Sequence, residues 1–385
     1  MTSGGVLRSV FKIGAPLVAA ALALSACGGT TGDGDSASGD KACDLKIGYF
    51  GPLTGDAANL GINIKNGAEL AVNEYNAKNA DCKVTLVSFD SQGDPSIAPG
   101  LAQKAVTDKK LVGIVGPAFS GESKAAGPIF AQAGLNTITA SATNPALSEN
   151  GWKTFHRILG NDATQGPAAA KYIKDILKAD KVFVSDDTSE YGKGLADIVK
   201  KDLGSAVVAT DQTAADGKQD DFSPTVTKAK ASGATVFFYG GYYSNASKLV
   251  KQLKSGGFTG QFVSADGVKD DGFIKGAGAA SEGTIVTCPC LPPDQAPEFA
   301  AAFKKAYNSD PATYSAEAYD AANVFLAAIK DGKTSSADMM SFISSYSAKG
   351  VTKTVKFDAK GEPAEVSVWA YKVTGGKIVP DQEIK

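Results

Sequence analysis

The sequence predicts an α/β protein made of two doubly wound lobes, each built around a parallel sheet. Strand-like apolar runs alternate with helical periodicities from about residue 44 to residue 287, a pattern typical of parallel sheets with right-handed crossovers. The alternation breaks once, near residues 157–161, and this break divides it into two series. The chain has 385 residues, which exceeds the roughly 250–300 residues at which a single hydrophobic core stops growing.

In the first series, short apolar runs indicate strands, and apolar residues three or four apart indicate helices. Ile64, Ala68 and Ala71, for example, fall on one side of the helix expected over 63–78. The expected strands are residues 45–50, 84–89, 111–115 and 136–140, and the expected helices are residues 63–78, 97–108 and 120–132.

The second series resumes with a helix and is followed by a tail of different character. Its expected helices are residues 163–177, 191–203, 221–231 and 245–255, and its expected strands are residues 181–185, 206–210, 235–239, 262–264 and 284–287. The tail contains expected helices at 298–307, 316–330 and 337–347 and expected strands at 351–358 and 365–373. We expect these last helices to pack on the first lobe.

The first 26 residues have the features of a secretory signal. Arg8 and Lys12 precede an apolar stretch over 13–24, which is too short for a stable transmembrane helix. Leu24-Ser25-Ala26-Cys27 resembles a bacterial lipobox, which implies that Cys27 is lipidated and becomes the mature N-terminus. Residues 27–43 are rich in Gly, Ser, Thr and Asp, so we expect a flexible, lipid-anchored tether.

The cysteines after the tether allow two disulfides in an exported chain. Cys43 and Cys82 each precede an expected strand, and two neighbouring parallel strands would place them side by side, so we pair them. Cys288 and Cys290 can then bridge only each other. A zinc site is the alternative for these cysteines, but it lacks ligands because His156 is the only histidine.

Composition and motifs argue against several function classes. The formal net charge of −2 and the lack of a basic stripe exclude a nucleic-acid binder. The Gly192-Lys193-Gly194 segment lacks the third glycine of a dinucleotide loop, and neither a phosphate-binding loop of the ATPase type nor a Gly-x-Ser-x-Gly elbow occurs. We therefore expect no enzyme, no cofactor and no metal, and we assign the lone His156 a structural role.

Loops that follow the expected strands carry the candidate binding groups, because ligands of parallel sheets bind beyond the carboxyl ends of strands. Ser120 begins a helix, where backbone N–H groups form an anion site, although an isolated Ser is more often only a cap. The other loop residues with hydroxyl, carboxylate or aromatic groups are Ser141, Thr143, Tyr191, Tyr242 and Asp266. A zwitterion with an apolar side chain would use all three kinds of group.

Seven of these segments together resemble the periplasmic leucine/isoleucine/valine-binding proteins of bacterial ABC importers. They are residues 47–55 (IGYFGPLTG), 116–120 (GPAFS), 141–145 (SATNP), 162–167 (DATQGP), 191–194 (YGKG), 239–242 (YGGY) and 265–267 (ADG). The resemblance implies the type I periplasmic-binding fold, with two lobes joined by three crossovers near 158–161, 290–292 and Ser367. It implies a first lobe of residues 44–159 and 291–366 and a second lobe of residues 160–290 and 367–385.

The resemblance also assigns ligand contacts to single positions of this chain. Ser120 matches the serine that binds the ligand carboxylate, and Thr143 matches the threonine that touches both charged groups. Ser141 matches a residue whose backbone carbonyl accepts from the ligand ammonium, and Asp266 stands where the family often has a Glu that pairs with it. The residues implied to surround the ligand side chain are Leu60, Phe119, Tyr191 and Tyr242.

The chain departs from the family pattern at two of these positions. Leu60 stands where an aromatic residue is common, and Phe119 stands where a small Cys occurs. Both residues are apolar but reshape the pocket, so the identity of the ligand side chain stays open. The family's usual disulfide is not carried over, because the cysteine pattern differs.

The resemblance implies an extracytoplasmic receptor that captures a branched-chain or other apolar L-amino acid and delivers it to an ABC permease with separate ATPase subunits. We expect a monomer anchored to the outer face of the cytoplasmic membrane by its lipid. One alternative is a receptor of the same fold for amides, urea or aromatic compounds. A weaker alternative is a secreted two-lobed enzyme that acts on a small polar substrate.

Overall fold

The computed structural model describes residues 43–215 and 217–385. The signal segment 1–26, most of the tether and Cys27 lie outside the described residues. Within the described ranges, no helix has the length and apolar character that a membrane span requires.

The first sheet has the strand order β2-β1-β3-β4-β5, and its neighbouring strands are parallel throughout. Its strands are β1 (Leu45–Gly51), β2 (Val84–Asp90), β3 (Leu111–Val115), β4 (Thr137–Thr139) and β5 (Phe155–Arg157). The helices between them are α1 (Ala58–Lys78), α2 (Ala98–Thr107) and α3 (Ser120–Ala133). The short strand β5 was not expected from the sequence, because its three residues are too few to show a period.

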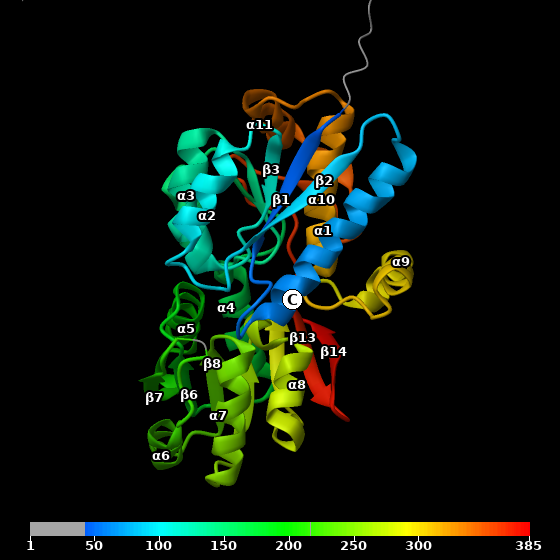
Figure 1. Cartoon of the computed structure of the whole chain (residues 1–385). Coiled ribbons are helices and arrows are strands. Elements are labelled where there is room, and N and C mark those ends of the chain that lie inside the picture. The colour runs from blue at the N-terminus through cyan, green and yellow to red at the C-terminus, as the bar shows by residue number, and fades with distance from the viewer. Residues whose placement is uncertain (1–42, 216) are drawn as a thin grey trace, which may run out of the picture. The chain divides into compact units, whose positions relative to one another are not determined.

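The tail helices pack on the first sheet and on its covering helices, as expected. They are α9 (Pro297–Tyr307), α10 (Ser315–Lys330) and α11 (Ser336–Ser345), and α10 lies alongside α1 (Figure 1). The two helices approach closely at Gly67, where a Cβ atom would lie 2.0 Å from the carbonyl oxygen of Ser315. Gly67 thus sets how closely α10 packs on α1.

The second sheet has the order β14-β13-β10-β9-β8-β6-β7. Its parallel strands are β6 (Val182–Asp186), β7 (Val207–Gln212), β8 (Val236–Gly240), β9 (Gln261–Ser264) and β10 (Ile285–Cys288). The helices of this part are α4 (Asp162–Lys171), α5 (Glu190–Leu203), α6 (Ser223–Ala231), α7 (Tyr243–Ser255) and α8 (Asp271–Ala277).

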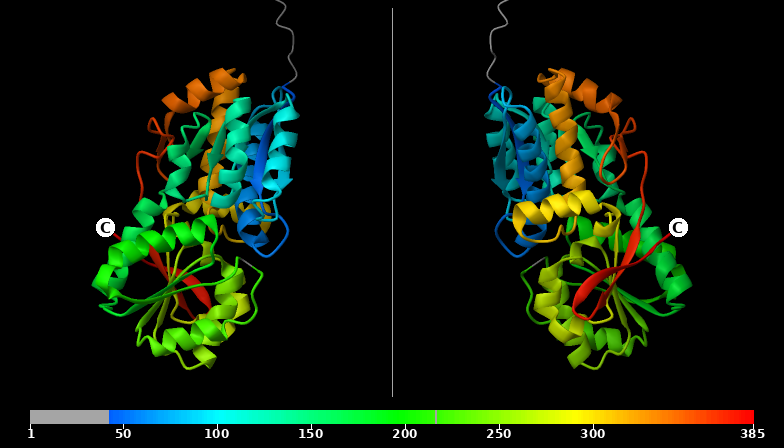
Figure 2. Two further views of the ribbon diagram at one scale, coloured as in Figure 1. Left: turned by 90° about the vertical axis from the view of Figure 1, so that its left-hand side faces the viewer. Right: turned by 90° about the vertical axis from the view of Figure 1, so that its right-hand side faces the viewer.

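At one edge, the second sheet departs from the parallel pattern. The strands β13 (Trp369–Thr374) and β14 (Lys377–Glu383) form an antiparallel hairpin, and β13 pairs antiparallel with β10 (Figure 2). The hairpin turns at Gly375 and Gly376, which both have positive φ, and this allows the tight turn that suits twisted strands. β14 was not predicted, since its apolar residues are sparse.

The remaining elements are short. The expected strand at 351–358 is reduced to β12 (Thr354–Lys356), which pairs with β11 (Ser347–Lys349) in a separate ribbon. Short 3₁₀ turns lie at Pro145–Asn150, Gly204–Ala206, Asp266–Val268, Gly278–Ser281 and Pro293–Gln295, and a π-helical turn lies at Tyr172–Ile176.

The chain passes between the two sheets three times. It leaves the first sheet after β5, returns after β10 and leaves again after β12. The structure thus has the two sheets and three crossovers of the expected type I periplasmic-binding fold.

The cysteines are paired as Cys43–Cys82 and Cys288–Cys290. The first disulfide joins the starts of the adjacent strands β1 and β2. In the chain-entropy model, closing this loop raises the free energy of unfolding by about 4 kcal/mol.

A buried ion pair fixes the first crossover against the loop after β4. Arg157 ends β5 and is fully buried, and its guanidinium pairs with Glu362 at 2.7 Å. The same guanidinium donates to the carbonyl oxygens of Ala142 at 2.5 Å and Asn144 at 3.1 Å. Arg157 therefore holds the backbone of the loop that carries Ser141 and Thr143.

Replacing Arg157 should destabilise the fold strongly. Arg157→Met leaves the Glu362 carboxylate and two loop carbonyls without their donor, and removing one partner of a buried pair costs about 3–5 kcal/mol. Urea unfolding followed by circular dichroism measures the loss. Lys360→Met is the matched control, because Lys360 pairs with Glu149 on the surface, where an exposed ion pair contributes little to stability. Equal losses in the two variants would contradict the role given to Arg157.

Candidate functional site

A small enclosed cavity lies at the carboxyl ends of strands from both sheets. Its lining residues are Leu60, Ile64, Phe119, Ser120, Ser141, Tyr191, Tyr242, Asp266, Gly267 and Tyr314. Ser120 and Ser141 follow β3 and β4 of the first sheet, while Tyr191, Tyr242 and Asp266 follow β6, β8 and β9 of the second. The cavity thus occupies the place that parallel sheets give to ligands, and each sheet supplies part of it.

The structure brings together the site residues expected from the sequence, with one difference. Thr143 does not line the cavity; it is buried directly beside the site, where its carbonyl accepts the N–H of Asp162 at 2.9 Å. Ile64, Gly267 and Tyr314 line the cavity without having been predicted. Tyr314 adopts a positive φ of 68°, a conformation that is costly for a bulky residue and occurs mainly at functional sites.

The start of α3 forms one end of the cavity. Ser120 is its first residue, and the Ser120 hydroxyl oxygen accepts the N–H of Asn144 at 3.2 Å. The Glu122 carboxylate accepts the N–H of Phe119 at 2.9 Å and is also bonded to the hydroxyl of Ser91. Burial raises the pKa of Glu122 to about 7. These bonds fix a helix start whose free N–H groups and positive dipole end attract an anion.

A buried carboxylate forms the opposite end. Asp266 is 4% exposed, and its Oδ1 accepts from the hydroxyl of Tyr191 and from the amide of Gln165, each at 2.8 Å. The N–H of Gly267 in turn donates to the Tyr191 hydroxyl at 3.1 Å. Burial raises the pKa of Asp266, and the hydrogen bonds from Tyr191 and Gln165 oppose that rise. Asp266 is therefore held in one orientation and needs a cation to be stable as a buried ion.

A second buried acid, Asp162, lies near the first and was not predicted. It is the first residue of α4 and is fully buried, and neither of its carboxylate oxygens has a hydrogen-bond partner among the described residues. Burial and the charge of Asp266 raise the pKa of Asp162 well above its usual range. From the sequence, Asp162 looked like an ordinary acid in the first turn of a helix, which is a frequent and purely structural position.

Further polar atoms near these acids also lack partners. Within the described residues, the unpaired buried atoms include Thr143 Oγ1, Gln165 Oε1 and Tyr314 Oη. Gln165 contacts Asp266, and the charge of Asp266 also affects Tyr314 by raising its pKa. The hydroxyls of Thr143 and Tyr314 can each donate one hydrogen bond to the neighbouring acids, whereas Gln165 Oε1 and the carboxylate oxygens can only accept, so acceptor sites remain at this end. A group with several N–H donors and a positive charge would satisfy them.

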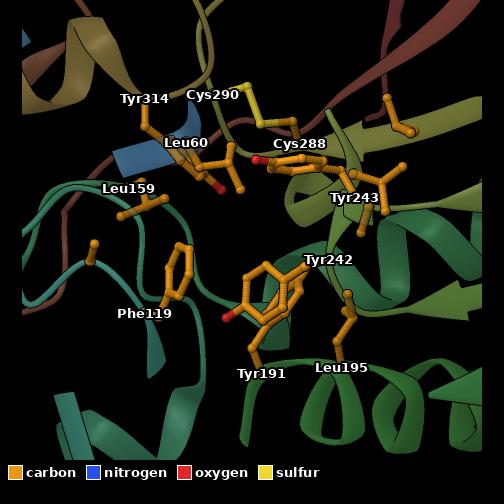
Figure 3. Close-up of a cluster of buried hydrophobic side chains, with 14 of the residues drawn as sticks. Leu60, Phe119, Leu159, Tyr191, Leu195, Tyr242, Tyr243, Cys288, Cys290 and Tyr314 are labelled. Atoms are coloured by element: carbon orange, nitrogen blue, oxygen red, sulfur yellow. A yellow bond between two sulfur atoms is a disulfide. The ribbon is translucent and has the colours of Figure 1, made fainter. Parts of the chain in front are cut away.

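Aromatic rings from both sheets cover the cavity. The centroids of Phe119 and Tyr242 are 4.6 Å apart, and those of Tyr242 and Tyr191 are 5.2 Å apart. Figure 3 shows Phe119 facing the rings of Tyr191 and Tyr242, with Leu60 and Tyr314 on another side. This wall is apolar and suits an apolar group between the two polar ends.

Polar contacts close the cavity from the side. Asn144 donates to the carbonyl oxygen of Glu190 at 2.7 Å, Lys124 pairs with the Glu190 carboxylate at 2.8 Å, and Asn59 donates to Asp270 at 3.3 Å. The free volume inside the cavity is only about 10 Å³. That is enough room for about one water molecule. An amino-acid-sized molecule therefore enters only when the two sheets move apart.

Metal or histidine chemistry finds no support in the described part of the chain. Its residues contain no group of three or more His, Cys, Asp or Glu placed to hold a metal ion. His156 lies in β5, where its ring is 5.1 Å from that of Phe357, and burial lowers its pKa to about 4. It does not line the cavity.

Comparison with known proteins agrees with this geometry. A curated relative from Brucella abortus, named Leu/Ile/Val-binding protein homolog 2, is 35% identical over 340 residues and covers 85% of this chain and 89% of its own. A leucine-binding protein from Thermotoga maritima superposes with a TM-score of 0.81 at 25% identity, covering 89% of this chain and 99% of its own.

A second solved structure is equally similar. It is the branched-chain amino acid transporter substrate-binding protein from Streptococcus pneumoniae in complex with isoleucine, with a TM-score of 0.81, 27% identity and coverage of 88% of this chain and 100% of its own. The model of the periplasmic binding protein family matches residues 44–377. Since that match spans most of the sequence and both sheets, the chain belongs to the periplasmic binding protein family.

Proposed function

We propose that this chain is an extracytoplasmic receptor that captures a branched-chain or other apolar L-amino acid and delivers it to an ABC-type permease. The family consists of substrate-binding proteins rather than enzymes. The observation that carries the proposal is the arrangement of the cavity. A helix start with Ser120 faces a buried Asp266 carboxylate across an apolar wall, and these three features match the three parts of an apolar amino acid.

The proposed contacts follow from this arrangement. Ser120 binds the ligand carboxylate at the start of α3, whereas Thr143, which was expected to share that role, does not line the cavity. The carbonyl of Ser141 and the carboxylate of Asp266 bind the ammonium group. The side chain lies among Leu60, Phe119, Tyr191 and Tyr242.

Full contact with the ligand requires the two lobes to close. We assign residues 44–159 and 291–366 to the first lobe and residues 160–290 and 367–385 to the second. Asp266 and both tyrosines then belong to the second lobe, and Ser120 belongs to the first. The ligand bridges them, stabilises the closed form, and presents that form to the permease.

The relatives support an amino acid ligand. The Brucella abortus relative is named for Leu, Ile and Val, and the Streptococcus pneumoniae structure contains isoleucine. The alternative ligands of this fold, amides, urea and aromatic acids, carry no ammonium group. They would leave Asp266 and Asp162 buried without a cation, at a cost of several kcal/mol.

Delivery to a permease places the receptor outside the cytoplasm. We propose that residues 1–26 are removed, that Cys27 carries the lipid, and that residues 27–43 tether the receptor to the outer face of the cytoplasmic membrane. The receptor acts as a monomer, and the ATPase subunits are separate chains.

Calorimetric titration of the mature protein tests the ligand class. Leucine, isoleucine, valine or phenylalanine should bind one per chain without turnover. Asp266→Asn keeps an acceptor for Tyr191 and Gln165 but removes the charge, so its affinity should fall by about 30- to 5000-fold. Asp271→Asn is the control, because Asp271 is an exposed acid five residues further along. A parent that binds none of the four amino acids would overturn the proposal, and an unaffected Asp266→Asn would remove Asp266 from the site.

The affinity should also depend on pH in a defined direction. The ionised form of Asp266 pairs with the ligand, and burial raises the pKa of both Asp266 and Asp162. These raised values belong to the closed form without ligand, whereas the open form that the ligand meets has its acids in water. Affinity should therefore be constant at neutral pH and decline as the pH falls through the ordinary Asp value of about 3.9, where Asp266 of the open form becomes protonated. Asp266→Asn should bind weakly with a flatter profile. A parent affinity that stays constant down to about pH 3 would contradict this assignment.

Mass spectrometry of the native protein tests the anchor. A diacylglyceryl group on Cys27 at the mature N-terminus is the expected result, and Cys27→Ser should release the protein from the membrane. Cys43→Ser is the control for loss of a cysteine as such. An unmodified N-terminus at another residue, with the protein free in the medium, would show that the lipobox assignment is wrong.

A further inference from the structure

Beside the cavity, three charged side chains connect the loop that carries Asp266 to two of the three crossovers. Lys269, Glu317 and Lys353 make up this hinge cluster. Lys269 and Glu317 are buried, and Lys353 is half-buried. None of the three lines the cavity, so ligand contact does not explain them.

Lys269 reaches from the second sheet's side to the first. It directly follows the turn Asp266–Val268, and its N–H donates to the carbonyl of Asp266 at 3.0 Å. Its Nζ lies 3.4 Å from Thr313 Oγ1, and the Thr313 hydroxyl donates to the Lys269 carbonyl. Thr313 precedes α10, which packs on the first sheet. Lys269 therefore ties the Asp266 loop to the segment that carries the cavity residue Tyr314.

The charge of Lys269 depends on Glu317. Burial lowers the pKa of Lys269 to about 8, and the Glu317 carboxylate gives the largest opposing effect. The ammonium also lies 4.3 Å from the centre of the Tyr371 ring, a favourable cation–π position. Asp270, Asp271 and Asp266 add smaller favourable charges. A buried ammonium is costly without opposite charge nearby. Glu317 supplies part of that charge, although the two side chains form no direct ion pair, and the direct polar contact of the Lys269 ammonium is with Thr313.

The other contacts of the hinge cluster lie on the crossovers. Glu317 Oε1 accepts the N–H of Leu291, in the second crossover, at 2.8 Å. Lys353 Nζ donates to the carbonyl of Ile158, in the first crossover, at 2.8 Å. The charge of Lys353 also lowers the pKa of Glu317, which burial raises. The cluster thus joins the loop of Asp266 to the two segments about which the lobes would move.

We propose that Lys269 is a positioning residue for ligand capture: on closure its ammonium enters the hinge cluster beside Glu317 and fixes the loop in which Asp266 meets the ligand ammonium. This inference rests on the proposed function, because it requires ligand-driven closure. Lys269 moves with the second lobe, whereas Thr313, Glu317 and Lys353 move with the first. The contact of Lys269 with Thr313 and its approach to the charge of Glu317 are therefore made only in the closed form, and they stabilise that form without touching the ligand.

Lys269→Met tests the proposal, because methionine keeps the length of the side chain and removes the charge. The dissociation constant for the amino acid that the parent binds should rise about 10- to 100-fold, mainly through faster dissociation. The order of preference among leucine, isoleucine, valine and phenylalanine should not change. The melting temperature of the ligand-free variant should stay close to that of the parent, because the contact with Thr313 is absent when the lobes are apart and the methionine side chain can still pack on Tyr371. Lys275→Met is the control, since Lys275 is an exposed lysine on α8.

A double-mutant cycle with Glu317→Gln separates this role from general damage to the fold. If Lys269 acts through Glu317, the double variant should lose no more affinity than the weaker-binding single variant. The proposal is overturned if Lys269→Met binds like the parent, if the two losses add, or if the ligand-free Lys269→Met protein melts at a lower temperature. A parent that binds none of the amino acids overturns the proposed function, and this inference falls with it.

Discussion

The burial of the Asp266 carboxylate is the constraint on which the arrangement of the site depends. An ionised carboxylate away from water needs hydrogen-bond donors and a cation. Tyr191 and Gln165 supply the donors, and they come from α5 and α4, which lie on either side of β6 in the chain. The positions of these two helices on the second sheet are thus tied to the orientation of one carboxylate.

The first sheet meets a complementary constraint at the start of α3. Its free N–H groups favour an anion, and Arg157 holds the neighbouring loop by its carbonyl oxygens. Arg157 ends β5 at the first crossover and pairs with Glu362 near the third. The same residue therefore stabilises the hinge region and shapes the anion-binding end of the cavity. Neither sheet forms the whole site alone. The helix start that favours an anion belongs to the first sheet, and the carboxylate that favours a cation belongs to the second.

The sequence predicts those site residues that combine a local signal with a fixed place in the fold. Ser120, Ser141, Tyr191, Tyr242 and Asp266 each follow a strand, so the alternation of strands and helices brings them to one edge. Tyr314 carries no such signal, since it precedes a helix of the tail and reaches the site only through the packing of α10 on α1. Lys269 and Glu317 are similarly distant in sequence, and their pairing depends on how the two sheets meet.

The same distinction explains the errors at the level of the fold. All parallel strands except β5 were predicted, and β1, β3, β6 and β8 in particular have apolar runs that are buried on both faces of the sheet. In β14, an edge strand, most residues are exposed, so it has little apolar pattern to detect. Asp162 shows why a single site residue can escape prediction from the sequence. An acid at a helix start has an ordinary structural explanation, so nothing marks it as part of a site. Only its burial without hydrogen-bond partners distinguishes it.

Two buried acids at one end of the cavity also determine when the lobes can close. Closure takes Asp162 and Asp266 out of water, and burial raises the pKa of both, so closure without a cation is opposed at neutral pH. Under the proposed function, the ammonium group of an amino acid would remove that penalty, and its apolar side chain would lie between the aromatic rings. A ligand shifts a two-state equilibrium only by its differential affinity for the two states. In this proposal the acids supply that difference, because they would make the closed form costly in the absence of a cationic ligand and favourable in its presence.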